Sequence, residues 1–208
     1  MNLGLITSYV IAGIILLAIL SMNMSVSSSS NEITLTQITR DRAASISDML
    51  SNDVQKMGYN RKKTTDPILT VAEGNKIQFR SNIDNSTDNS VEIITWEFTN
   101  TAASNTKNPN DKVLMRTVRD ASSGSLISQT PIKSGVTKFR ISYYEKYGAA
   151  RKDSVSTPLS SSEMGNVKQL YISLELQSHE KIYKSSGGSG RYVTSVWEKR
   201  FSPPNLEF

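Results

Sequence analysis

The sequence predicts an α+β protein in which one long N-terminal helix packs on an antiparallel β-sheet. Three observations lead to this prediction. The first 31 residues carry no charged side chain, residues 33–57 repeat apolar side chains at helical spacing, and from Ile68 onward apolar and polar residues alternate. A helical period followed by a strand period, with no clear helix between the strands, is typical of an α+β architecture with antiparallel strands.

The first element is an apolar run from Leu3 to about Met24, rich in Leu, Ile, Val, Ala, Gly and Met. A membrane-spanning helix needs about 20 such residues, so we predict a transmembrane segment over residues 1–26. A cleaved signal peptide and a buried core helix are the two alternatives. Signal peptides usually begin with a basic region, whereas no Lys or Arg precedes Arg40 here.

The apolar run also holds the candidate positions for contacts with lipid or with neighbouring helices. Small residues let helices approach closely in a bilayer, where association depends on packing. Thr7 and Ser8 are further candidates, for hydrogen bonds between helices. The six positions selected for the membrane and assembly surface are Leu5, Tyr9, Ala12, Gly13, Ile14 and Leu17.

Residues 27–59 are predicted to form an amphipathic helix. Their apolar residues recur mostly at spacings of three and four, which places them on one side of a helix. We expect four of them, Ile38, Ile46, Leu50 and Val54, to pack on the sheet. Ser30 or Asn31 is suited to cap a new helix, or the serines continue the first helix unbroken. A continuous helix from residue 3 to 57 would be about 80 Å long.

Residues 60–208 are predicted to form one β-rich domain of six or seven antiparallel strands. Gly74-Asn75 is a typical hairpin turn between the first two strands. Later strands alternate so that one face is apolar. The predicted apolar faces carry Ile94, Trp96 and Phe98; then Phe139, Ile141 and Tyr143; then Leu170, Ile172, Leu174 and Leu176.

The residues that usually carry catalysis are scarce. The chain has no cysteine and one histidine, His179, on a predicted strand where a solvated side chain is the simplest interpretation. It lacks the G-x-S-x-G, phosphate-loop and dinucleotide-binding motifs. We therefore expect no enzymatic activity and no cofactor.

Two polar features were considered as binding sites. The oxygen-rich loop from Asp84 to Asn89 is of a kind that can hold calcium, but its spacing favours a plain polar turn. The net charge is +5 and a basic cluster occupies residues 61–63. Because no recognition helix or stacking motif accompanies these charges, nucleic acid is not an expected partner.

The layout of the chain resembles type IV pilins and the pseudopilins of type II secretion, and local features resemble the larger minor pilins. ISDMLSNDVQKMGYN (46–60) is similar to the end of their helix, and NKIQFRSNIDNSTDNSVEIITWEF (75–98) to the hairpin that follows. GVTKFRISYYEKYG (135–148) resembles a later strand that ends in paired tyrosines, and FSPPNL (201–206) is a weaker likeness to the final strand end.

This resemblance implies a non-enzymatic, membrane-anchored subunit of a filament or of a secretion or envelope assembly. It would be a single-pass protein with an extracytoplasmic C-terminal domain, and its partners would be membrane lipid and copies of itself or other pilin-like subunits. Tyr9 stands where the family's leader motif places Glu, and a leader ending at Gly4 would carry no basic residue. We therefore expect the N-terminus to be retained.

Two other functions remain open from the sequence. The first is a membrane-tethered extracytoplasmic binding or adhesion domain that does not polymerise. The second is a component of a larger envelope machine that uses the long helix in a bundle.

Overall fold

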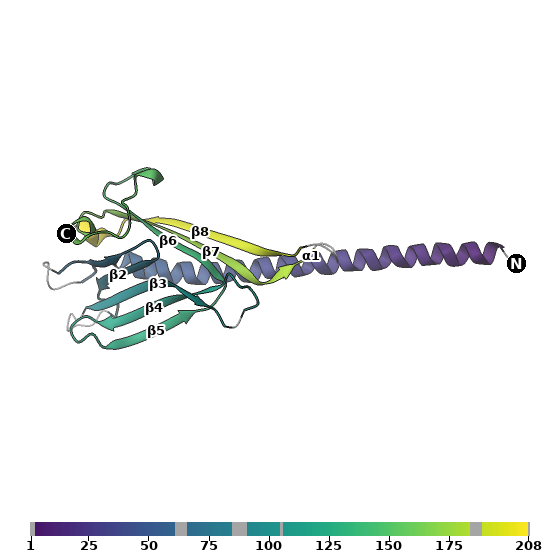
Figure 1. The fold of residues 1–208 in the computed structure, drawn as a ribbon, viewed down its shortest axis with the longest axis horizontal. Coiled ribbons are helices and arrows are strands. Elements are labelled where there is room, and N and C mark those ends of the chain that lie inside the picture. Colours follow the sequence, from purple (N-terminus) through teal and green to yellow (C-terminus); the bar gives the residue numbers. More distant parts are fainter. Residues whose placement is uncertain (1–2, 61–65, 85–90, 105, 184–188, 208) are drawn as a thin grey trace.

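A computed structural model describes residues 3–60, 66–84, 91–104, 106–183 and 189–207 of the chain. Its dominant element is α1 (Leu3–Gln55), one helix of 53 residues, which at 1.5 Å per residue is about 80 Å long. Figure 1 shows that the N-terminal half of α1 projects alone and that the C-terminal half lies alongside the strands. The helix runs through the serines without interruption, so no new helix begins at Ser30 or Asn31.

The strands form two antiparallel sheets, each built from neighbours in sequence. The first sheet has the order β1-β2-β3-β4-β5 and the second β6-β7-β8. Short helical turns lie at η1 (Arg151–Asp153), α2 (Ser161–Met164) and η2 (Pro204–Glu207). The strands are β1 (Leu69–Ala72), β2 (Lys76–Ser81), β3 (Glu92–Ala102), β4 (Lys112–Asp120), β5 (Leu126–Ile132), β6 (Val136–Tyr144), β7 (Gln169–Ile182) and β8 (Arg191–Phe201).

The predicted fold class is confirmed, with two corrections. The antiparallel strands are divided between two sheets where one was expected, and β5 was not predicted. β5 is an edge strand in which Leu126 and Ile127 are exposed, so its sequence lacks the alternation of a strand with one buried face. The predicted hairpin around Gly74-Asn75 is present as β1 and β2.

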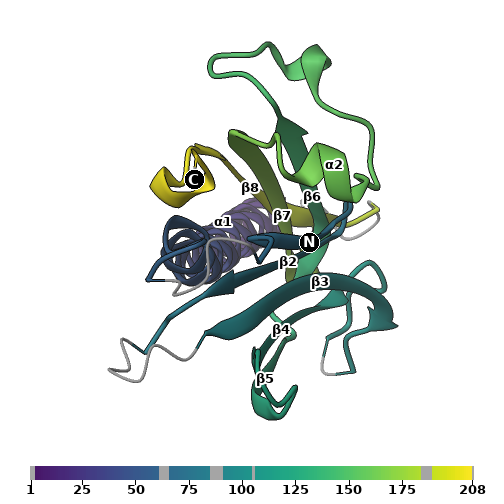
Figure 2. The same cartoon turned by 90° about the vertical axis from the view of Figure 1, so that its left-hand side faces the viewer.

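The C-terminal half of α1 packs mainly against β7 and β8. Viewed along the helix in Figure 2, it lies with β8 on one side and the first sheet on the other. Leu50 and Val54 of the helix, Trp96 of β3 and Ile172 of β7 are all fully buried in one apolar cluster. The helix therefore shares its core with both sheets.

The position of the buried stripe on α1 differs from the prediction at one residue. Ile46, Leu50 and Val54 are buried, but Ile38 is 39% exposed, so its predicted burial was wrong. The buried residue at this level is Thr39, about 100° further round the helix. Its hydroxyl donates to the carbonyl oxygen of Leu35 at 2.7 Å, which satisfies its polar group inside the helix.

Candidate membrane-anchoring helix and its junction with the β-domain

The N-terminal half of α1 is apolar and uncovered. Every residue from 3 to 27 is exposed, and the most apolar stretch of the helix has no residue buried by the rest of the chain. A core helix of a soluble domain would be covered, so the buried-helix alternative is wrong for this half. The helix is long and apolar enough to cross a membrane, and the architecture is compatible with a single-pass membrane protein.

The six positions selected from the sequence are all exposed but do not share one side of the helix. Leu5, Tyr9, Gly13 and Leu17 are spaced by four residues and form one continuous row. Ala12 and Ile14 flank this row, each about 100° from Gly13 and on opposite sides of it. The row combines large residues with one small one, which suits close contact with a second helix.

Gly13 has no role in packing within its own chain. A Cβ atom placed there would meet no described atom within 4 Å, and the residue lies in regular helix. A glycine in a helix interior costs about 1 kcal/mol relative to alanine. No contact within the described part of the chain therefore accounts for a small residue at this position.

Thr7 and Ser8 use their hydroxyl hydrogens inside the helix. Thr7 Oγ1 lies 3.0 Å from the carbonyl oxygen of Gly4, and Ser8 Oγ donates to the same carbonyl at 2.9 Å. These bonds satisfy the hydroxyl donors without water, as a lipid environment requires. They leave only the hydroxyl oxygens, as acceptors, for any bond to a neighbouring helix.

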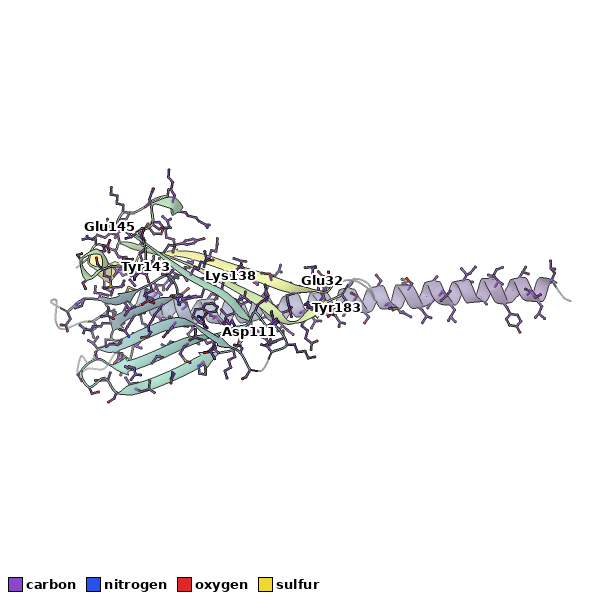
Figure 3. All side chains as sticks on the ribbon, in the orientation of Figure 1. Glu32, Asp111, Lys138, Tyr143, Glu145 and Tyr183 are labelled. Carbon is purple, nitrogen blue, oxygen red and sulfur yellow. The ribbon has the colours of Figure 1, made fainter. Side chains whose placement is uncertain are left out.

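The β7–β8 hairpin contacts α1 through a hydrogen bond and an ion pair where the helix leaves the domain. Ser28 Oγ donates to the carbonyl oxygen of Tyr183 at 2.9 Å, and Arg191 forms an ion pair with Glu32. Figure 3 labels Glu32 and Tyr183 at this junction. Sequence reasoning missed these contacts because nothing in residues 28–32 indicates which strand end lies against them.

A buried ion pair locks the C-terminal end of α1 to the first sheet. Asp53 is 2% exposed and accepts from Arg116 Nε at 2.6 Å and from Arg116 Nη2 at 2.9 Å. Its Oδ2 also accepts from Trp96 Nε1 at 2.8 Å. The sequence did contain a signal, since Asp53 lies between the apolar residues Leu50 and Val54 on the buried stripe. A charge in that position needs a partner.

A second buried carboxyl, Asp111, lies at the end of the first sheet nearer the junction (Figure 3). It is fully buried, and burial raises its pKa, opposed by the nearby charges of His179 and Arg42. His179 is half-buried, with Nδ1 3.0 Å from Thr106 Oγ1. Burial lowers the pKa of His179, with Arg42 of α1 as the next cause. His179 is thus part of a packed polar junction, not the solvated side chain expected.

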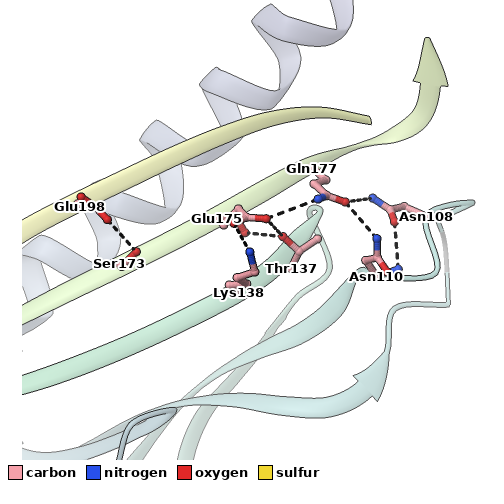
Figure 4. Close-up of polar contacts among 8 residues, drawn as sticks. All are labelled: Asn108, Asn110, Thr137, Lys138, Ser173, Glu175, Gln177 and Glu198. Carbon is pink, nitrogen blue, oxygen red and sulfur yellow. Dashed lines mark hydrogen bonds and ion pairs between the residues drawn. The ribbon is translucent and has the colours of Figure 1, made fainter. Parts of the chain in front are cut away.

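The outer face of the second sheet carries a chain of polar contacts, drawn in Figure 4. Lys138 Nζ donates to Glu175 at 2.7 Å, and Gln177 accepts from Asn108 Nδ2 at 3.1 Å. These charges are matched by neighbours on the same face. This is the surface of an ordinary hydrated sheet.

The one candidate calcium site from the sequence gains no support from the described residues. The Asp84–Asn89 loop lies, from residue 85 on, outside them. Among the residues that the structure does describe, no group of three or more histidine, aspartate and glutamate side chains is placed to hold a metal ion.

No model of a known protein family matches this sequence, and a search of the curated proteins found no match either. The fold and the uncovered helix define an architecture: a β-rich domain on a helix long and apolar enough to cross a membrane.

Proposed function

We propose that this protein is a non-enzymatic, membrane-anchored structural subunit of the pilin-like kind, with its β-domain outside the cytoplasm. The observation that carries the proposal is the division of α1. One continuous helix has a C-terminal half buried in the domain and an apolar N-terminal half that nothing in the chain covers. An uncovered apolar surface of this length is stable only in lipid or against other apolar helices.

The junction supports this assignment because it fixes the direction of the exposed half. The contacts of Ser28 and Glu32 with the β7–β8 hairpin hold α1 at the edge of the domain. A simple tether needs no such fixation. A subunit that must present its apolar helix to neighbours in one orientation does need it.

In the proposed assembly, the row of Leu5, Tyr9, Gly13 and Leu17 packs against the helices of neighbouring subunits. Contacts with protein then replace contacts with lipid, and the β-domains face outward. Whether neighbours are copies of this chain or other pilin-like subunits does not change the chemistry of the contact.

Cysteine cross-linking tests the proposal, and the chain suits it because it has no native cysteine. The double variant Tyr9→Cys, Ile14→Cys has two thiols on different sides of the helix, about 140° apart, so oxidation in the membrane should join each subunit to two neighbours and give a ladder of cross-linked species. Ser45→Cys, on an exposed position of the covered half, is the control and should give no cross-linked product. A single dimer band, or no product, from the double variant would favour the membrane-tethered binding or adhesion domain.

A further inference from the structure

We propose that the end of the β7–β8 hairpin is a membrane-surface contact that binds the headgroup of an anionic phospholipid. This inference rests on the proposed membrane anchoring and adds a lipid-binding site to it. The site consists of Lys181, Tyr183 and Tyr192 on the hairpin, together with the groove between the hairpin and α1.

The length of the helix sets the depth of this site. The apolar run from Leu3 to Met24, about 22 residues, spans about 33 Å, which matches a hydrocarbon core about 30 Å thick. Ser28 follows Met24 by four residues and so lies about 6 Å further along the axis. Each headgroup layer is about 5–7 Å thick. Because Ser28 bonds to the carbonyl of Tyr183, Tyr183 lies at headgroup level.

The side chains at the hairpin end suit that level. Tyr183 is 57% exposed, and its ring lies over Gly190, where an added Cβ would fall 2.6 Å from the ring. Tyrosine is enriched at the membrane–water boundary, because its ring is apolar and its hydroxyl is wet. Lys181 lies beside it, with Nζ 5.4 Å from the centre of the Tyr192 ring.

The charges at this end favour an anion. Of the two nearby carboxylates among the described residues, Glu32 is paired with Arg191 and Glu180 with Lys107. Lys181 is left without a carboxylate partner in that described part of the chain. A lysine without a carboxylate partner among the described residues, beside two tyrosines, complements a lipid phosphate.

The groove beside the hairpin has the polarity of a phospholipid. The end of the groove nearer the N-terminus of α1 is lined mainly by Leu17, Leu20 and Met24, with Ser21 and Asn23 among them. The end nearer the β-domain is lined mainly by hydroxyl and amide side chains of α1, together with Leu35, and by residues 180–183 of the hairpin. An acyl chain fits the apolar part while the headgroup meets the polar part, so the groove crosses the same boundary that the helix length defines.

The test uses the full-length chain in vesicles, with a polarity-sensitive fluorophore on a single cysteine. Ser189→Cys carries the probe, because Ser189 is exposed at the hairpin end and is none of the three site residues. Tyr147→Cys is the control, because Tyr147 is also exposed and lies two residues after Glu145, which Figure 3 places at the opposite end of the domain. A quencher is attached to the headgroup of either phosphatidylglycerol or phosphatidylcholine.

We expect strong quenching at position 189 and none above background at position 147. Quenching at 189 should be stronger from phosphatidylglycerol, and Lys181→Gln should weaken that preference by about fivefold, as for one lysine near an anionic surface. Equal quenching at 189 and 147 in vesicles that retain the protein overturns the lipid site alone. Protein that fails to float with the vesicles overturns the proposed anchoring. A cross-link from position 189 to α1 of a second copy overturns the lipid as occupant of the groove.

Discussion

The two halves of α1 share one backbone geometry and differ in what covers them. Residues 39–57 pass between two sheets and bury Leu50 and Val54 completely, whereas residues 3–27 are exposed throughout. The uncovered half is nevertheless the more apolar of the two. The most apolar part of this helix is thus the part that the protein itself does not cover. In a soluble domain the most apolar surface of a helix is the buried one.

The largest expected effect is a loss of folding stability when an aspartate is placed in the covered half of α1 but not when it is placed in the uncovered half. Leu50→Asp places a charge without a partner in the core and costs several kcal/mol, enough to unfold a domain whose total stability is about 5–15 kcal/mol. Leu17→Asp should leave the melting temperature unchanged and instead oppose membrane insertion by about 3 kcal/mol. Thermal unfolding in detergent and membrane fractionation measure the two outcomes. Equal melting curves for both variants would contradict the division.

The second prediction concerns the pair that holds the covered half in place. Arg116→Met leaves Asp53 buried without its cation and should cost about 3–5 kcal/mol. Arg119→Met on the same strand removes an exposed side chain and should change stability by no more than about 0.5 kcal/mol. Chemical denaturation measures both, and the double variant Asp53→Asn, Arg116→Met, which removes both charges and keeps an acceptor for Trp96 Nε1, should recover most of the loss. Similar effects at 116 and 119 would show that the pair does not anchor the helix.

The third prediction concerns the uncovered half. Gly13→Leu fills the small position in the row of four and should weaken self-association by an amount on the order of 1 kcal/mol. Insertion should be unchanged or slightly better, because leucine is more apolar than glycine. Cross-linking through Ile14→Cys beside membrane fractionation gives both readouts, with Ile15→Leu as the control. Undiminished cross-linking in Gly13→Leu would leave the helix as a tether only.

The smallest expected effect is a change in the pKa of His179, which depends on how close the beginning of the covered half of α1 lies to β7. Arg42 of α1 lowers the pKa of His179 on β7, so Arg42→Gln should raise that pKa. Because the chain has one histidine, its imidazole signals can be followed in an NMR titration without assignment. Arg40→Gln, on an exposed position two residues away, should leave the titration unchanged. A titration unaffected by Arg42→Gln would place this turn of α1 away from β7.

The sequence was informative where a pattern repeats over many residues. The long charge-free run and the three-and-four spacing predicted α1 through to its end, and the alternation of β3, β6 and β7 predicted their buried faces, except that Phe98 of β3 is only partly buried. Such patterns follow from the geometry of one element and do not depend on its neighbours.

The sequence was uninformative where an outcome depends on contacts between distant elements. Ile38 and Thr39 are adjacent in the sequence. Which of the two is buried depends on the side of the helix that faces the sheets at this level, and the sequence of the helix does not indicate that side. β5 has no buried face to produce alternation, and the partner of Asp53 lies 63 residues away in the chain. The hydrogen bond from Ser28 is accepted by the backbone carbonyl of Tyr183. Every residue type has such a carbonyl, so the sequence does not indicate this contact.

We infer that α1 passes from a bilayer into the domain without a break. Ile14 and Ile33 test it directly, because both are isoleucines on the same helix and both are exposed in the structure, by 62% and 70%. The single variants Ile14→Cys and Ile33→Cys are reacted with a water-soluble, membrane-impermeant maleimide in sealed vesicles with the domain outside. The account predicts that the thiol of Ile33→Cys is labelled at the rate of a free surface thiol and that the thiol of Ile14→Cys is protected until detergent is added. Equal labelling of the two variants before detergent would contradict it.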